Sequence, residues 1–265
     1  MDLQLTGRRA IVTGASRGIG RAVALGLAAE GVDVALVARD RERLEGTAAA
    51  VRGQGAAALV RPTDTRDDAS VRAMVADVVG AWGGIDVLVN AAARPASSAS
   101  VPALADLSDD ALREEVETKV LGYLRCARAV APHMVAAGWG RIINVSGLNA
   151  RLTGSLVGSV RNVAVAAMTK NLADELGPSG ITVTVVHPGT TVTEALPQRL
   201  AARAERAGTS AAELAARLAE GVSIGRLVTA EEVADVVTFL ASPRSAAITG
   251  DAIAVGGGTR GAIHY

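Results

Sequence analysis

The chain has 265 residues, of which 49% are hydrophobic, and its 27 basic residues are balanced by 27 acidic ones. This length is sufficient to bury a substantial core. The balanced charge argues against binding to nucleic acid or to an anionic membrane. With Cys126 as its only cysteine, the chain has no internal disulfide or cysteine-based metal cluster. We expect Cys126 to be a core residue, and we expect no metal site.

The first residues and the apolar runs also bear on location. Residues 1–9 lack the apolar region of a signal peptide. No apolar run approaches the ~20 residues that span a membrane. We therefore expect a cytoplasmic protein that makes no membrane contact.

Short apolar runs alternate along the chain with helical patterns. The predicted strands are 10–13, 33–37, 57–60, 85–90, 141–145, 181–186 and 252–255. The predicted helices are 18–30, 41–52, 67–82, 109–137, 154–176 and 230–241. Nearly all-apolar strands separated by helices indicate a parallel sheet that is buried on both faces. The pattern therefore predicts one α/β domain, a doubly wound, three-layer sheet of the Rossmann type spanning residues 1–265.

Residues 190–228 depart from this alternation. They contain no predicted strand and carry two small amphipathic helical pieces, 196–206 and 211–220. The segment follows a strand end late in the chain, where open α/β sheets place their ligand crevice. We interpret it as a substrate lid. The alternative is a surface excursion or an oligomer contact.

Residues 10–20 read AIVTGASRGIG, a strand followed by a glycine-rich turn and the start of a helix. Gly14 allows a sharp exit from the strand, Gly18 allows backbone to approach a pyrophosphate, and Gly20 allows the helix to sit close to the sheet. The amide groups of the turn, including those of Ser16 and Ile19, would face the phosphates at the helix N-terminus. The turn therefore predicts a dinucleotide site.

The end of the second predicted strand helps to select the cofactor. An acidic residue there would bind the adenosine ribose of NAD, but the chain has Ala38 followed by Arg39. Arg17 stands in the glycine turn, and two guanidinium groups can hold a 2′-phosphate through charge-assisted hydrogen bonds. We expect NADP(H) in preference to NAD(H). The alternative is that Arg39 is a solvated cation neutralised by Asp40.

The Gly-x3-Gly-x-Gly spacing after Thr13 resembles that of the short-chain dehydrogenase/reductase family. The Asn-Ala-Ala segment at 90–92, the Pro188-Gly189 pair followed by Thr193, and the C-terminal segments at 225–227, 239–242 and 249–257 also resemble the family's motifs. The resemblance covers almost the whole chain and implies a homodimer or homotetramer. It further implies cofactor contacts near the adenine, the adenosine and the nicotinamide, which fall on Asp64, Thr65, Asn90, Pro188, Gly189, Thr191 and Thr193.

The resemblance also implies a catalytic serine, a tyrosine four residues before a lysine, and a relay asparagine. Alignment of the end of the helix at 154–176 puts Gly158 at the tyrosine position and Asn162 at the lysine position. Alignment from residues 144–147 instead puts Val160 and Ala164 there. The two registers also disagree about whether Ser146 or Gly147 matches the serine. In both, the tyrosine and lysine are absent.

Lys119 stands where the family's relay asparagine belongs. All but two of the 27 basic residues are arginine, and Lys170 is the other lysine. Lys119 could enter the space left by the missing lysine and hold the ribose or a substrate oxyanion. Alternatively, it fills space or pairs with Glu115 four residues earlier. Asn162 remains able to hydrogen-bond a ribose hydroxyl, so Ser146, Lys119 and Asn162 are the candidate catalytic residues.

Other polar residues allow both a functional and a structural interpretation. Arg151 and Arg161 would bind an acidic substrate or have a solvated or interface role. His187 would be a proton donor near the nicotinamide or a core residue. Tyr265 would reach a neighbouring subunit's site or have no role there.

Three functions remain open from the sequence. The first is an NADP-dependent oxidoreductase acting on a small carbonyl or hydroxyl compound, with non-standard proton delivery from Lys119, Ser146, substrate or water. The second is an inactive dinucleotide-binding sensor or partner subunit. A non-redox enzyme that uses the dinucleotide structurally is a third. The substrate is not identified by the sequence.

Overall fold

The computed structural model describes residues 1–93 and 101–261. Its central element is a seven-stranded, fully parallel sheet with the order β3-β2-β1-β4-β5-β6-β9. The strands are β1 (Arg9–Thr13), β2 (Asp33–Ala38), β3 (Ala58–Pro62), β4 (Val87–Asn90), β5 (Gly140–Val145), β6 (Ile181–Pro188) and β9 (Ala252–Val255). β1 and β4 are neighbours in the sheet, and the strand order runs outward from them in opposite directions. The ligand crevice of this fold therefore lies at the carboxyl ends of these two strands.

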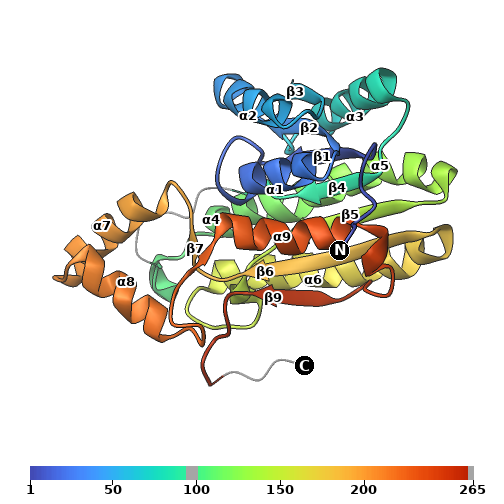
Figure 1. Cartoon of the computed structure of the whole chain (residues 1–265). Helices are drawn as coiled ribbons and strands as arrows, with labels where there is room; N and C mark the ends of the chain where they lie inside the picture. The colour runs from blue at the N-terminus through green and yellow to red at the C-terminus, as the bar shows by residue number, and fades with distance from the viewer. Residues whose placement is uncertain (94–100, 262–265) are drawn as a thin grey trace.

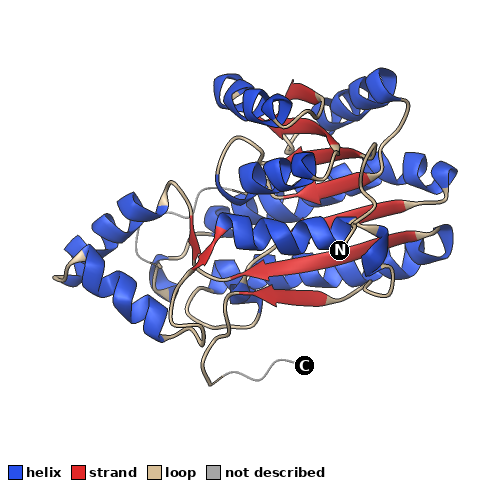
Figure 2. Cartoon of the chain, in the orientation of Figure 1, coloured by secondary structure: helices blue, strands red, loops and turns tan. Residues whose placement is uncertain are grey.

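Helices cover both faces of the sheet (Figures 1 and 2). One core cluster joins the sheet to α1 (Gly18–Ala29), α2 (Arg41–Gly53) and α9 (Ala230–Ala241). A second joins the opposite face to α3 (Asp68–Trp82), α5 (Gly122–Ala137) and α6 (Leu156–Leu176). Short 3-10 turns lie at Leu104–Asp106, Leu148–Ala150, Gly177–Ser179 and Pro243–Ser245. The predicted three-layer α/β fold is confirmed.

Most predicted element bounds agree with the structure within a few residues. β6 extends beyond its predicted end to Pro188 because it pairs there with Val255 of β9. β4 begins at Val87 rather than at residue 85. Asp86 precedes it, and its carboxylate forms ion pairs with Arg8 and Arg9.

The predicted long helix 109–137 is interrupted near its middle. It consists of α4 (Asp109–Glu115), a π-helical segment η2 (Val116–Leu121) and α5. The apolar periodicity continues through all three, so the sequence pattern did not reveal the interruption. A π-helical turn inside a helix is common at functional sites. This one carries Lys119.

The segment 190–228 forms α7 (Leu196–Ala207) and α8 (Ala211–Glu220), which stand to one side of the sheet (Figure 1). The prediction that it contains no strand is wrong. Strand β7 (Thr191–Val192) pairs with β8 (Val228–Thr229), so both ends of the segment are joined at its base. Two-residue strands bear too little periodicity to be recognised from sequence. We call residues 190–228 the helical excursion.

Two smaller predictions concern Cys126 and membrane-spanning segments. Cys126 is fully buried, and burial raises the pKa of its thiol to about 12, which confirms a core residue. No helix in the described part of the chain is long and apolar enough to cross a membrane.

Candidate functional site

The glycine-rich turn between β1 and α1 has the close packing that its sequence predicts. Gly14 has a φ of +70°, and a Cβ there would lie 2.7 Å from the backbone oxygen of Ala91. A Cβ on Gly20 would lie 2.3 Å from the oxygen of Gly14. The hydroxyl of Thr13 accepts hydrogen bonds from the amides of Ala91 and Ala92, which fixes the turn against the end of β4. Side chains at these glycines would break the turn.

The N-terminus of α1 already binds a negative group. The amide of Gly18 donates to Oε2 of Glu194 at 3.0 Å, so a carboxylate from the helical excursion lies where an anion is stabilised. Arg17, the N-cap residue, provides no side-chain cap. The backbone donors and the glycine cradle fit the diphosphate of a dinucleotide, and the Glu194 carboxylate occupies the place of one of its anionic oxygens.

A cavity of about 1290 Å³ opens at the carboxyl ends of the central strands. Twelve of the predicted site residues line it: Gly14, Ser16, Arg17, Gly18, Ile19, Gly20, Arg39, Asp64, Thr65, Lys119, Ser146 and Thr193. The excursion contributes Glu194, Ala195 and Arg199. Arg66, Arg113 and Glu117 also line the cavity. Sequence reasoning missed these charged residues, because no motif distinguishes them from solvated surface charges.

Five predicted site residues lie outside the cavity lining. Asn90 is fully buried, and its amide donates to Oδ1 of Asn144 at 3.0 Å. Gly189 packs against Gly256. The hydroxyl of Thr191 donates to the carbonyl of Gly189 at 3.0 Å. The remaining two are Pro188, buried at the end of β6, and Asn162, buried on α6. Their predicted contacts with the cofactor remain predictions.

Arg17 and Arg39 are exposed cations on the cavity wall. In the described part of the chain, neither side chain has a hydrogen bond or an ion pair. Asp40, which could have neutralised Arg39, instead caps α2 by accepting from the amide of Arg43 and pairs with that residue's guanidinium at 3.2 Å. Both arginines therefore present their charge to the cavity.

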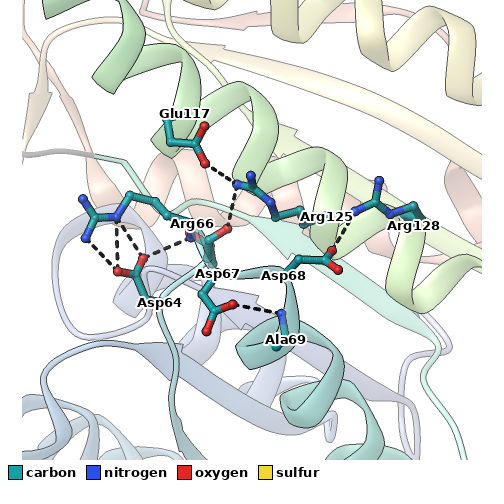
Figure 3. A network of polar contacts seen from close by, with 9 residues as sticks. Asp64, Arg66, Asp67, Asp68, Ala69, Glu117, Arg125 and Arg128 are labelled. Carbon is teal, nitrogen blue, oxygen red and sulfur yellow. Dashed lines mark hydrogen bonds and ion pairs between the residues drawn. The ribbon is translucent and has the colours of Figure 1, made fainter. Parts of the chain in front are cut away.

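A network of charged groups forms the wall beside β3 (Figure 3). Arg66 holds Asp64 through both carboxylate oxygens, at 2.7 to 3.1 Å. This hydrogen bonding holds the pKa of Asp64 below its usual range, and Arg39 adds to the effect. Glu117 pairs with Arg125 at 2.7 Å (Figure 3). The acidic groups of this wall are thus already neutralised, which reduces their repulsion of an anionic ligand.

Lys119 is the one lysine on the cavity wall and is 3% exposed. Its Nζ donates to the carbonyl of Ser146 at 2.9 Å and to Oδ1 of Asn162 at 3.1 Å. An ammonium group has three donors, so one is left for a ligand. Burial, reinforced by the nearby positive charge of Arg161, lowers the pKa of Lys119 to about 7. Lys119 therefore releases its proton far more readily than an ordinary lysine.

The residues of the two sequence registers differ in burial on α6. Gly158 and Asn162 are buried, whereas Val160 is 45% exposed. A Cβ on Gly147 would lie 3.0 Å from Nδ2 of Asn162, so residues 158 and 162 belong to the face that packs on the end of β5. A Cβ on Gly158 would lie 2.8 Å from Oγ of Ser155. The position therefore has no room for a larger side chain without local rearrangement.

The remaining candidates have structural partners. Glu115 pairs with Arg161 rather than with Lys119. Arg151 donates to the carbonyl of Ala252 at 2.9 Å. His187 is buried, and its Nδ1 accepts from the amide of Gly147 at 3.4 Å. Ser146 donates through Oγ to the carbonyl of Asn162 at 3.2 Å. Tyr265 lies outside the described residues, and Lys170 is exposed and pairs with Asp174.

A doubly wound sheet with a glycine-rich turn at its switch point and a lined cavity above it defines a dinucleotide-binding α/β protein. The family model described as enoyl-(acyl carrier protein) reductase matches residues 14–260. The chain belongs to the short-chain dehydrogenase/reductase family of oxidoreductases.

Three similar proteins illustrate this relationship. The short-chain reductase protein NovJ of Streptomyces niveus is 38% identical over 250 residues, which cover 94% of this chain and 92% of that protein. The L-sorbose reductase of Gluconobacter frateurii, solved with NADPH and L-sorbose, has a TM-score of 0.91 and 30% identity, covering 99% of this chain and 100% of that one. An NAD+-bound xylitol dehydrogenase has a TM-score of 0.89 and 27% identity, covering 96% and 100%.

Proposed function

We propose that this chain is an NADP(H)-dependent oxidoreductase that acts on a small carbonyl or hydroxyl compound, with Lys119 as its proton-transfer group. The observation that carries the proposal is the buried amine of Lys119 on the cavity wall, held by Ser146 and Asn162. In this proposal, Gly158 and Asn162 replace the family's tyrosine and lysine. Lys119 on the π-helical segment then stands where the family has its asparagine, and Asn162 on α6 stands where the family has its lysine.

The preference for NADP(H) rests on Arg17 and Arg39. Both line the cavity, and neither is hydrogen-bonded or ion-paired among the described side chains. Ala38 supplies no carboxylate to repel a phosphate. The NADPH-bound sorbose reductase supports this choice, while the NAD+-bound xylitol dehydrogenase shows that the fold also accommodates the other cofactor.

In the proposed reaction, the cofactor transfers the hydride and Lys119 transfers the proton. The bound nicotinamide would supply or accept the hydride. In the reducing direction, the ammonium of Lys119 transfers one proton to the substrate oxygen as the carbonyl becomes an alcohol, and the resulting amine regains a proton from water. In the oxidising direction, the neutral amine accepts the hydroxyl proton. A group with a pKa of about 7 serves both directions at neutral pH.

Ser146 and Asn162 act as holders of the amine. The carbonyl of Ser146 and the side-chain oxygen of Asn162 accept two of its three hydrogens, so the third has a defined direction. Asn162 also remains our candidate for a hydrogen bond to the ribose. We further propose that the helical excursion is a substrate lid, because Glu194, Ala195 and Arg199 bring it to the cavity.

We also propose that the chain forms a homodimer or homotetramer. Leu156, Val160 and Val163 of α6 are between 45% and 50% exposed, and they place an apolar stripe on this helix. Sedimentation of the purified chain tests this, and a monomer at micromolar concentration contradicts it.

Fluorescence titration with NADPH and NADH, followed by a screen of ketoses and small keto esters for NADPH consumption, tests the function. We expect tighter binding of NADPH and turnover of at least one carbonyl class. Tighter binding of NADH contradicts the roles of Arg17 and Arg39. Binding without turnover of any compound contradicts the enzyme and favours a dinucleotide-binding sensor or partner subunit.

A further inference from the structure

A partly buried ion pair lies within electrostatic reach of Lys119. Glu115 is the last residue of α4 and pairs with Arg161 of α6; each side chain is 19% exposed. Arg161 directly precedes Asn162, the residue that accepts a hydrogen bond from Lys119. Glu115 lies immediately before the π-helical segment. The pair therefore joins α4, which leads into the segment that carries Lys119, to α6, which carries its partner Asn162.

The two charges act on Lys119 in opposite directions. The positive charge of Arg161 lowers the pKa of Lys119, and the negative charge of Glu115 raises it. Nε of Arg161 is buried without a hydrogen-bond partner in the described structure, and no second carboxylate pairs with this guanidinium there. Removal of Glu115 would consequently leave an uncompensated positive charge beside the amine.

The other charged groups around Lys119 have partners of their own. On the π-helical segment, Glu117 pairs with Arg125 of α5. On α4, Arg113 pairs with Asp109 and Asp110. The phenol of Tyr123 on α5 donates to the carbonyl of Val145, and His187 on β6 accepts from the amide of Gly147. Glu114, the neighbour of Glu115, also has an interaction partner.

We propose that Arg161 and Glu115 are positioning residues for Lys119, because their ion pair ties α4, which leads into the segment that carries the amine, to α6, which carries its partner Asn162, and places one charge of each sign near it. The pair does not touch the cavity and has no proton to transfer in this role. It sets how readily Lys119 releases its proton. The catalytic consequence rests on the proposed function, but the effect on Lys119 does not.

The chain offers a direct measurement, because Lys119 and Lys170 are its only lysines. Protein labelled with ¹³C at the lysine Cε gives two side-chain NMR signals, which Lys170→Arg assigns. A pH titration then reports each pKa without cofactor or substrate. We expect Glu115→Gln to lower the pKa of Lys119 and Arg161→Gln to raise it, each by about one unit. The double variant should return close to the wild-type value.

Matched variants control for loss of charge elsewhere. Asp109→Asn removes an 82% exposed carboxylate from α4, and Asp174→Asn removes the partner of Lys170 on α6. Neither should move the Lys119 signal. If water entered a loosened helix contact, both single variants would shift the pKa upward together, towards the ordinary lysine value. Shifts in the same direction, or no shift in either variant, overturn the proposal.

Turnover separates this inference from the proposed function. Opposite pKa shifts in a chain that reduces no carbonyl support the ion-pair role and contradict the enzyme. In an active enzyme, the pH at which the rate changes should move down in Glu115→Gln and up in Arg161→Gln. If the Lys119 signals shift in opposite directions but the pH profile of an active enzyme is unmoved by either variant, the ion-pair role stands and Lys119 is not the proton donor.

Discussion

The buried amine of Lys119 makes a specific prediction about stability and pH. Its pKa is lowered from 10.5 to about 7 in the folded protein, whereas in the unfolded chain it has its ordinary value. Between these two pH values the unfolded state binds one more proton. The free energy of unfolding therefore rises with pH across this window, by up to ~1.4 kcal/mol per pH unit. Below pH 7 both states are protonated, and the contribution is absent.

The magnitude follows from the width of the window. A shift from 10.5 to about 7 corresponds to about 5 kcal/mol. Relaxation around the ammonium and entry of water reduce this, so we expect about 2–5 kcal/mol. Lys119→Met keeps an unbranched side chain of similar length but cannot titrate. It also loses the hydrogen bonds to Ser146 and Asn162, which lowers stability by a similar amount at every pH.

Urea unfolding of the wild type and of Lys119→Met between pH 6.5 and 10.5 measures the effect. Other groups that titrate in this range are common to both proteins and cancel in the difference. We expect the stability of the wild type relative to the variant to increase steadily from pH 7 to pH 10.5. Parallel profiles would refute the reasoning, because they would mean that Lys119 has an ordinary pKa and a solvated ammonium.

Three further predictions concern the cofactor site. Arg39→Ala should weaken NADPH binding about tenfold while leaving NADH binding unchanged; equal losses for both cofactors in fluorescence titrations would contradict a contact with the 2′-phosphate. Glu194→Gln should bind NADPH a few-fold more tightly, because the carboxylate on the Gly18 amide competes with the diphosphate, and weaker binding would argue against that competition. Gly20→Ala should lower the free energy of unfolding by about 1–3 kcal/mol, because its Cβ would lie 2.3 Å from the oxygen of Gly14. A variant that unfolds at the same urea concentration as the wild type would contradict this packing.

The fold was predictable because its signal is local and repeated. Apolar strands alternate with helices, and the glycine turn after β1 has a strand before it and a helix after it. Thr191 and Val192 form a strand only because Val228 and Thr229 lie beside them. Two residues carry no periodicity, so the sequence could not reveal this strand.

The sequence supplied candidate residues for the site but not the contacts between them. The sequence identified Lys119 as a candidate and left its partner open between Glu115 and the catalytic space. In the structure, the π-helical segment packs against α6 and the end of β5, which brings Asn162 and Ser146 to the amine. Such pairings depend on how helices distant in sequence pack together. The partner of Glu115, 46 residues further along the chain, is set in the same way.

The most direct test of the account compares carbonyl reduction by the wild type and by Lys119→Met, at saturating NADPH and pH 7. If Lys119 transfers the proton, the variant should bind NADPH with an affinity within a few-fold of the wild type. Its turnover number should fall by about 10² or more. A variant that binds NADPH and reduces the same carbonyl at the wild-type rate would contradict the central role of this lysine.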